Sequence, residues 1–140
     1  MSEAQTLSYT KTQVATRLRT YKLLFGMSII IDAAIGLFAI VDPVGLARLL
    51  TLPDPDPDAW ARVWGATVVG LQILYLPGLN NPLFYRWPNW SSIGIKLFTA
   101  IVLACAGAYF RPLAAWELLW SVILFLTYYQ LTLSDLRSHP

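Results

Sequence analysis

The segment Leu23–Val41, LLFGMSIIIDAAIGLFAIV, decides the fold class of this chain. Apart from Ser28 and Asp32 it is apolar, and it has the roughly 17–25 residues that an α-helix needs to cross the hydrocarbon core of a membrane. Three further segments share this character: Trp60–Leu76, Ile93–Phe110 and Leu113–Leu133. The sequence therefore predicts an all-α integral membrane protein, a bundle of four transmembrane helices forming one membrane domain over residues 1–140.

The composition agrees with this fold class. Of the 140 residues, 56% are hydrophobic and only 13% are charged, whereas about a quarter of a soluble domain is charged. A net charge of +2 is too small to indicate a nucleic-acid partner. We expect membrane lipids, and other membrane subunits or further copies of this chain, as the partners.

The segments before and after the first span are predicted to lie at the membrane surfaces. Residues 1–22 form a basic juxtamembrane segment, with helix-compatible spacing from Tyr9 to Lys22. Proline ends the first span at Asp42-Pro43. The following residues, Val44–Leu52, place leucines around Arg48, which predicts a short amphipathic helix at the interface.

An acidic loop follows this short helix. Asp54, Asp56 and Asp58 alternate with prolines, which favours an extended path. The loop is a candidate docking site for a basic external partner. Asp58 is also placed to cap the N-terminus of the second span.

The remaining connections set the order of the helices. Turn-forming residues fill Pro77–Trp90, and Ser91 or Ser92 is a candidate cap for the third span. Only Arg111-Pro112 separates the third and fourth spans, so these two should be antiparallel neighbours.

Lysine and arginine counts predict the orientation. With the N-terminus inside, six of these residues lie on the cytoplasmic side and three on the other side, including Arg62 at the edge of a span. Since cytoplasmic loops carry the excess of positive charge, we expect a multi-pass protein of the cell (inner) membrane with both termini cytoplasmic.

Each span carries one ionisable residue: Asp32, Arg62, Lys96 and Glu117 in chain order. Charges inside a membrane are costly unless they are paired or face inward, so these four should form a buried charge network. Depth along the spans predicts the pairs Asp32–Lys96 and Arg62–Glu117. Two acids then balance two bases, which favours a structural role over a proton or substrate path.

Small residues suggest a second interface. Ala100, Ala104 and Ala108 recur every four residues on the third span, a spacing that allows close helix packing within the bundle or between copies.

Familiar catalytic and cofactor motifs are missing from the sequence. His139 is the only histidine and Cys105 the only cysteine. No haem-ligating histidine pair, CxxC motif or phosphate-binding loop is present, so we predict no catalytic residue, no cofactor-binding residue and no metal ligand.

Part of the layout resembles a known family. The first half of the chain has an Asp42-Pro43 exit from the first span, then Gly45-Leu46-Ala47-Arg48-Leu49-Leu50, then Arg62-Val63-Trp64-Gly65 at the start of the second span. In these features it resembles the small four-span bacterial membrane proteins of the DoxX-like kind and neighbouring families. The resemblance implies an accessory membrane subunit and assigns no catalytic residue.

The sequence therefore favours a non-catalytic membrane subunit that assembles with other membrane proteins or with itself. One alternative is an oligomeric small transporter or channel with Asp32 and Lys96 on its path. Another is a redox-complex subunit associated with a lipid or a quinone.

Overall fold

The computed structural model describes residues 3–138, and the side chains of residues 11–138. Within this range the chain is all-α and contains no strand, as predicted. The elements are, in chain order, α1 (Glu3–Val41), α2 (Pro43–Leu49), α3 (Ala59–Asn80), α4 (Arg86–Ala106), the 3₁₀ turn η1 (Ala108–Phe110) and α5 (Arg111–Ser138).

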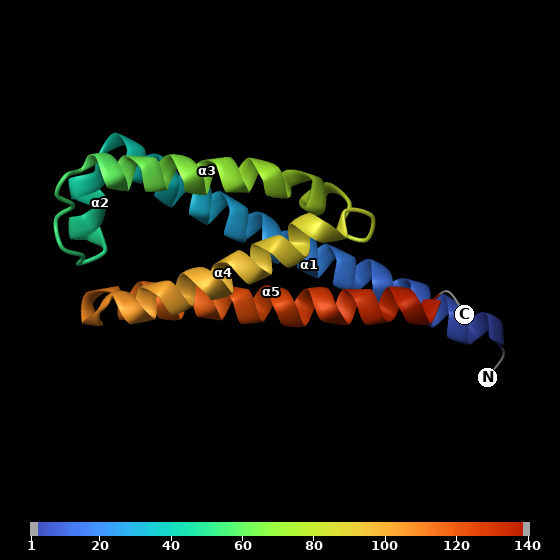
Figure 1. The fold of residues 1–140 in the computed structure, drawn as a ribbon. Helices are drawn as coiled ribbons and strands as arrows, with labels where there is room; N and C mark the ends of the chain where they lie inside the picture. The colour runs from blue at the N-terminus through green and yellow to red at the C-terminus, as the bar shows by residue number, and fades with distance from the viewer. Residues whose placement is uncertain (1–2, 139–140) are drawn as a thin grey trace.

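The four long helices run up and down along a common direction (Figure 1). α1 packs against both α3 and α5, and α4 packs along α5 in the predicted antiparallel arrangement. α3 and α4 lie close together at the turn that joins them and diverge toward the opposite end of the bundle, where α2 lies (Figure 1). The start of α1 and the end of α5 lie at the same end.

Within the described residues, three helical segments are long and apolar enough to cross a membrane: Lys11–Val41, Arg86–Ala106 and Ala108–Ser138. α3 is not one of the three. It carries Arg62 near its start, and Gln72 and Asn80 further along.

Asp42 and Pro43 form the junction between α1 and α2. α1 ends at Val41, and the Asp42 carboxylate accepts a hydrogen bond of 2.8 Å from the backbone N–H of Gly45. Pro43 occupies the first turn of α2, where the missing N–H would have had no helical partner. The proline therefore both ends α1 and begins α2.

The turn between α3 and α4 is shorter than the sequence predicts. α3 continues through Pro77 to Asn80, and α4 begins at Arg86. A proline inside a helix removes one hydrogen bond but need not end the helix. Pro88 lies in the first turn of α4, where a missing N–H is tolerated. Ser91 and Ser92 therefore lie inside α4, and the prediction that one of them caps it is wrong.

The buried side-chain amide of Asn89 forms hydrogen bonds that hold this turn against the bundle. Asn89 is fully buried and donates to the carbonyls of Pro82 and Tyr85, at 3.2 and 2.8 Å. It accepts from the Tyr21 hydroxyl of α1 at 2.8 Å, while the Tyr128 hydroxyl of α5 donates to the Pro82 carbonyl at 3.0 Å. Three helices and the turn thus share one hydrogen-bond network.

Two glycines let α1 and α3 approach closely. A Cβ atom on Gly65 would lie 2.5 Å from the Gly36 carbonyl oxygen and 2.9 Å from the Ala39 Cβ. The small-residue faces of the two helices therefore meet with their backbones almost in contact, a packing mode typical of membrane helices.

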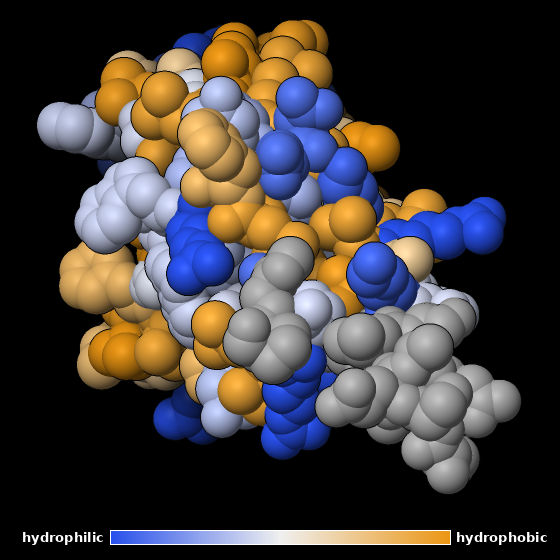
Figure 2. Space-filling view, turned by 90° about the vertical axis from the view of Figure 1, so that its right-hand side faces the viewer, coloured by the Kyte–Doolittle hydropathy of each residue, from blue (hydrophilic) through white to orange (hydrophobic). Residues whose placement is uncertain are grey.

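Apolar side chains cover much of the outside of the bundle. Leu23, Ile30 and Phe98 are all more than 60% exposed. Figure 2 looks onto the end where α1 begins and α5 ends, and hydrophilic side chains gather on that end with hydrophobic ones around them. This distribution fits a protein whose flanks face lipid and whose ends face water.

Candidate functional site

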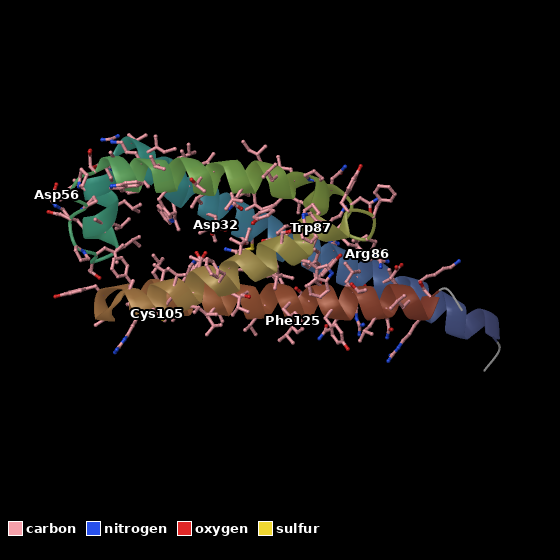
Figure 3. The ribbon with its side chains drawn as sticks, in the orientation of Figure 1. Asp32, Asp56, Arg86, Trp87, Cys105 and Phe125 are labelled. Atoms are coloured by element: carbon pink, nitrogen blue, oxygen red, sulfur yellow. The ribbon has the colours of Figure 1, made fainter. Side chains whose placement is uncertain are left out.

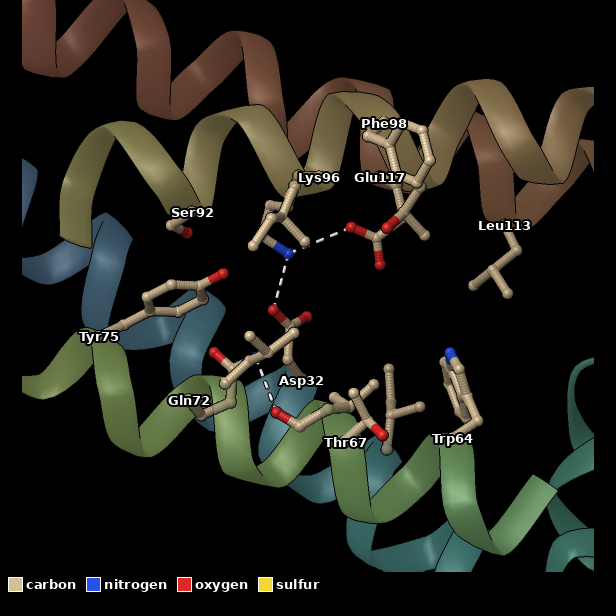
Figure 4. Close-up of a pocket in the computed structure, with 15 residues that line it drawn as sticks. Asp32, Trp64, Thr67, Gln72, Tyr75, Ser92, Lys96, Phe98, Leu113 and Glu117 are labelled. Atoms are coloured by element: carbon tan, nitrogen blue, oxygen red, sulfur yellow. Dashed lines mark hydrogen bonds and ion pairs between the residues drawn. The ribbon is translucent and has the colours of Figure 1, made fainter. Parts of the chain in front are cut away.

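Three ionisable side chains from three helices meet inside the bundle. The Lys96 ammonium of α4 lies 2.7 Å from Asp32 Oδ2 of α1 and 3.2 Å from Glu117 Oε2 of α5. The Asp32–Lys96 contact is the pairing that the sequence predicts. Figure 4 shows both carboxylates turned toward the Lys96 ammonium. We call Asp32, Lys96 and Glu117 the charge cluster.

The charge cluster is well shielded from its surroundings. The side chains of Lys96, Asp32 and Glu117 are 7%, 10% and 17% exposed. Taking such charges out of water costs several kcal/mol per ion, and the cost is recovered only by close pairing. With two carboxylates and one ammonium among the described side chains here, the fully ionised cluster carries one excess negative charge.

Arg62 does not belong to this cluster, so the predicted Arg62–Glu117 pair is wrong. Its guanidinium lies 3.1 Å from Asp58 Oδ2, and the two side chains are 45% and 50% exposed. It also donates to the carbonyls of Ile40 and Val41. Arg62 sits in the first turn of α3, beside the last turn of α1, where backbone carbonyls lack helical partners.

Asp58 takes a different role from the one predicted. It precedes α3, but its side chain makes no capping hydrogen bond. Its carboxylate binds Arg62 one turn further along instead. The predicted balance of two buried acids and two buried bases therefore becomes a balance of two acids and one base.

The charge cluster forms part of the wall of a cavity of about 290 Å³ between α3 and α4. Trp64, Thr67, Leu71, Gln72 and Tyr75 line it from α3, and Ser92, Ile95, Lys96, Phe98 and Thr99 line it from α4. Phe98 is 66% exposed and Trp64 41% exposed. Since both residues reach the protein surface, the cavity opens between the two diverging helices (Figure 4).

Tyr75 carries a polar atom that the protein does not satisfy. The residue is only 5% exposed, and its buried hydroxyl has no hydrogen-bond partner among the residues that the structure describes. Figure 4 shows this hydroxyl directed into the cavity, on the side of the charge cluster. A buried hydroxyl without a partner is unfavourable, so a group held in the cavity would supply what the protein lacks.

A second cavity of about 380 Å³ lies toward the α2 end. Leu46 of α2, Leu52 just after it, Asp54 of the acidic loop and Leu103 of α4 are among its lining residues. Trp64 and Leu113 line both cavities, and Figure 4 shows them on opposite sides of one edge of the first cavity, which we call the inner cavity. The two cavities therefore adjoin at these two side chains.

The structure separates the three alanines of the predicted packing interface. Ala100 is buried against α5, but Ala104 is exposed, and Ala108 lies beyond the end of α4 in η1. Gly107, with φ of 131°, breaks the helix between them. Ala100 and Ala104 instead line a shallow hollow of about 290 Å³ with Ala114 and Ala115 of α5.

The acidic loop lies at the α2 end, with Asp54, Asp56 and Asp58 all exposed; Figure 3 labels Asp56 there. Within residues 11–138 there is no group of three or more potential metal-binding side chains. Cys105 is exposed near the end of α4 (Figure 3), and His139 lies outside the described residues.

Sequence reasoning identified Asp32, Lys96 and Glu117 but missed Tyr75. The signal that could have found it is its spacing. Tyr75 follows Gln72 by three residues, so these two polar side chains lie on one helix face.

Comparisons with known proteins give no relative. No family model, no curated protein and no solved structure matches this chain. The resemblance to the DoxX-like proteins therefore stays a prediction.

Proposed function

We propose that this chain is a four-span protein of the cell membrane, with both termini cytoplasmic, that binds a small solute in the cavity between α3 and α4 and carries it across the bilayer. Asp32, Lys96 and Glu117 are its charged solute-handling groups. The observation that carries this proposal is the excess carboxylate of the charge cluster at the wall of that cavity.

Length and charge placement support α3 as the fourth span. Its 22 residues give a helix about 33 Å long, against a hydrocarbon core of about 30 Å. Arg62 is its only ionisable residue besides Tyr75. Because Arg62 lies in the first turn and binds Asp58 of the loop, its charge can reside at the membrane surface.

A purely structural cluster would be expected to pair its charges completely. An additional buried carboxylate costs several kcal/mol unless a proton or a positively charged group neutralises it. Ionisable residues within membrane segments mark substrate and ion pathways by default. The cluster has the composition expected for a site that takes up a cation or a proton from its surroundings.

Cysteine accessibility tests this proposal without knowledge of the solute. Thr67→Cys, on the cavity wall, is compared with Ile30→Cys on the outer surface of α1, both in a Cys105→Ala background. A membrane-impermeant methanethiosulfonate is applied to right-side-out and to inverted vesicles. We expect Thr67→Cys to react from both faces and Ile30→Cys from neither. Reaction of Thr67→Cys from one face only would refute transport, and reaction from neither would refute a solute cavity altogether.

A second candidate function is a non-catalytic subunit that assembles with other membrane proteins or with itself. The observation that favours it is the hollow at Ala100, Ala104, Ala114 and Ala115, whose small side chains leave room for a helix of another chain. Native mass spectrometry of the gently extracted protein tests this function. Ala104→Leu should release a bound chain if the hollow holds it, and a wild-type spectrum showing the monomer alone would refute assembly.

A further inference from the structure

We infer that the ligand of the inner cavity is a hydrophobic organic ammonium ion, a molecule with a cationic nitrogen that bears N–H donors and an aryl or alkyl tail. The inference rests on the proposed solute-binding function and adds the chemical class of the solute. It is carried by the juxtaposition of the excess carboxylate, the unpartnered Tyr75 hydroxyl and the apolar, aromatic wall of one cavity.

The excess negative charge of the charge cluster favours a cationic ligand. Lys96 neutralises one carboxylate, and with a neutral or anionic guest the second, which is at most 17% exposed, would have to take up a proton. A carboxylate offers about four lone-pair sites, and Lys96 occupies one oxygen of Asp32 and one of Glu117. Acceptor capacity therefore remains on both carboxylates for the N–H donors of a second ammonium.

The Tyr75 hydroxyl provides a further polar contact. It is directed into the cavity on the side of the cluster (Figure 4), and it lacks a partner among the described residues. A phenol hydroxyl both donates and accepts, so it can accept a hydrogen bond from an ammonium that also binds a carboxylate.

The remaining lining residues of the cavity favour a ligand whose uncharged part is apolar. The rings of Trp64, Tyr75 and Phe98 line the cavity together with Leu71 and Ile95. Aromatic faces attract cations as well as apolar groups. Because the cavity opens between α3 and α4 toward the lipid-facing surface, a tail longer than the cavity can extend into the bilayer.

Radiolabelled phenethylammonium is a suitable test ligand, and 2-phenylethanol is its neutral counterpart of similar shape. Binding is measured by equilibrium dialysis against nanodiscs of zwitterionic lipid that hold the full chain, with empty nanodiscs as the baseline. Glu117→Gln removes the excess charge and Tyr75→Phe removes the hydroxyl alone. Asp56→Asn removes an exposed carboxylate of the acidic loop and serves as the matched control.

We expect saturable binding to the wild type, unchanged in Asp56→Asn and not displaced by 2-phenylethanol. Glu117→Gln should weaken binding at least 10-fold, as loss of a charge-assisted contact does, and Tyr75→Phe about 3- to 10-fold. Binding no greater than to empty nanodiscs, equal binding by Glu117→Gln, or displacement by 2-phenylethanol as effective as by the unlabelled amine would each overturn the inference.

Two further readouts keep the test decisive. If Glu117→Gln aggregates on size-exclusion chromatography, the Tyr75→Phe affinity and the neutral competitor still decide, because neither changes a charged residue. If Thr67→Cys reacts with the thiol reagent while phenethylammonium does not bind, the solute cavity stands and the ammonium assignment fails. If Thr67→Cys reacts from neither face, the proposed function itself fails.

Discussion

Replacing both acids of the charge cluster should destabilise the protein far more than the two single replacements combined. Either Asp32→Asn or Glu117→Gln leaves Lys96 with one ionised partner, at 3.2 or 2.7 Å respectively. The new amide can still accept a hydrogen bond and the excess carboxylate is removed, so neither single change should lower the unfolding free energy by more than about 1 kcal/mol. The double replacement leaves a buried ammonium with no ionised partner.

The expected loss of unfolding free energy in the double variant follows from the burial of Lys96, whose side chain is 7% exposed. Removing the partner of a buried charge costs about 3–5 kcal/mol, so the double variant should lose that much and the coupling should exceed about 1 kcal/mol. Lys96→Met should lose a similar amount because it strands two carboxylates. Arg62→Met, which breaks a half-exposed pair, should lose at most about 1 kcal/mol.

Reversible unfolding by sodium dodecyl sulfate in mixed micelles, followed by helical circular dichroism, measures these differences. The Glu117→Gln value decides between two arrangements. If Glu117 were paired with Arg62, as the sequence predicts, the single change would cost as much as breaking a buried pair. Additive losses in the double variant, or a Lys96→Met loss no larger than that of Arg62→Met, would refute the shared-lysine arrangement.

Three further predictions concern packing and topology. Gly65→Ala should cost about 1–3 kcal/mol, since the new Cβ would meet the Gly36 carbonyl; a stability equal to wild type in the same assay would contradict the close crossing. Asn89→Leu should cost about 3 kcal/mol or more, because it leaves several buried polar groups without partners, and unchanged unfolding would show that the network at this turn is dispensable. In a cysteine-free background, Asp56→Cys should be labelled by an impermeant maleimide on intact cells and Arg137→Cys should not, and the reverse pattern would refute cytoplasmic termini.

Much of the helix arrangement follows from simple features of the sequence. Long apolar runs predict helices, and the short Arg111-Pro112 connection predicts the antiparallel packing of α4 on α5, which the structure confirms. The end of α3 was predicted too early because Pro77 was taken to end the helix. The residues that hold the true turn, Tyr21 and Asn89, act through contacts between distant parts of the chain, which no local pattern reveals.

The charged residues of the site could be predicted from the sequence, but only one of their pairings could. A single charge in an apolar run is conspicuous, so Asp32, Lys96 and Glu117 were identified from the sequence alone. Their pairing was inferred from depth along predicted spans, and depth cannot tell which side of its helix a residue occupies relative to a neighbour. Arg62 was misassigned because its partners include the carbonyls of Ile40 and Val41, and backbone acceptors have no sequence signal.

The two ends of the bundle differ in a way that bears on how a solute would reach the charge cluster. At the turn between α3 and α4, the buried Asn89 of α4 donates to the carbonyls of Pro82 and Tyr85 and accepts from the Tyr21 hydroxyl of α1, so moving this turn away from α1 and α4 would break several bonds at once. Toward α2 the two helices diverge (Figure 1), and the side chains of Trp64 and Leu113 line both the cavity of the cluster and the second cavity. Rotating a side chain is far easier than breaking a buried network, so the α2 end is the side from which the charge cluster is most readily reached.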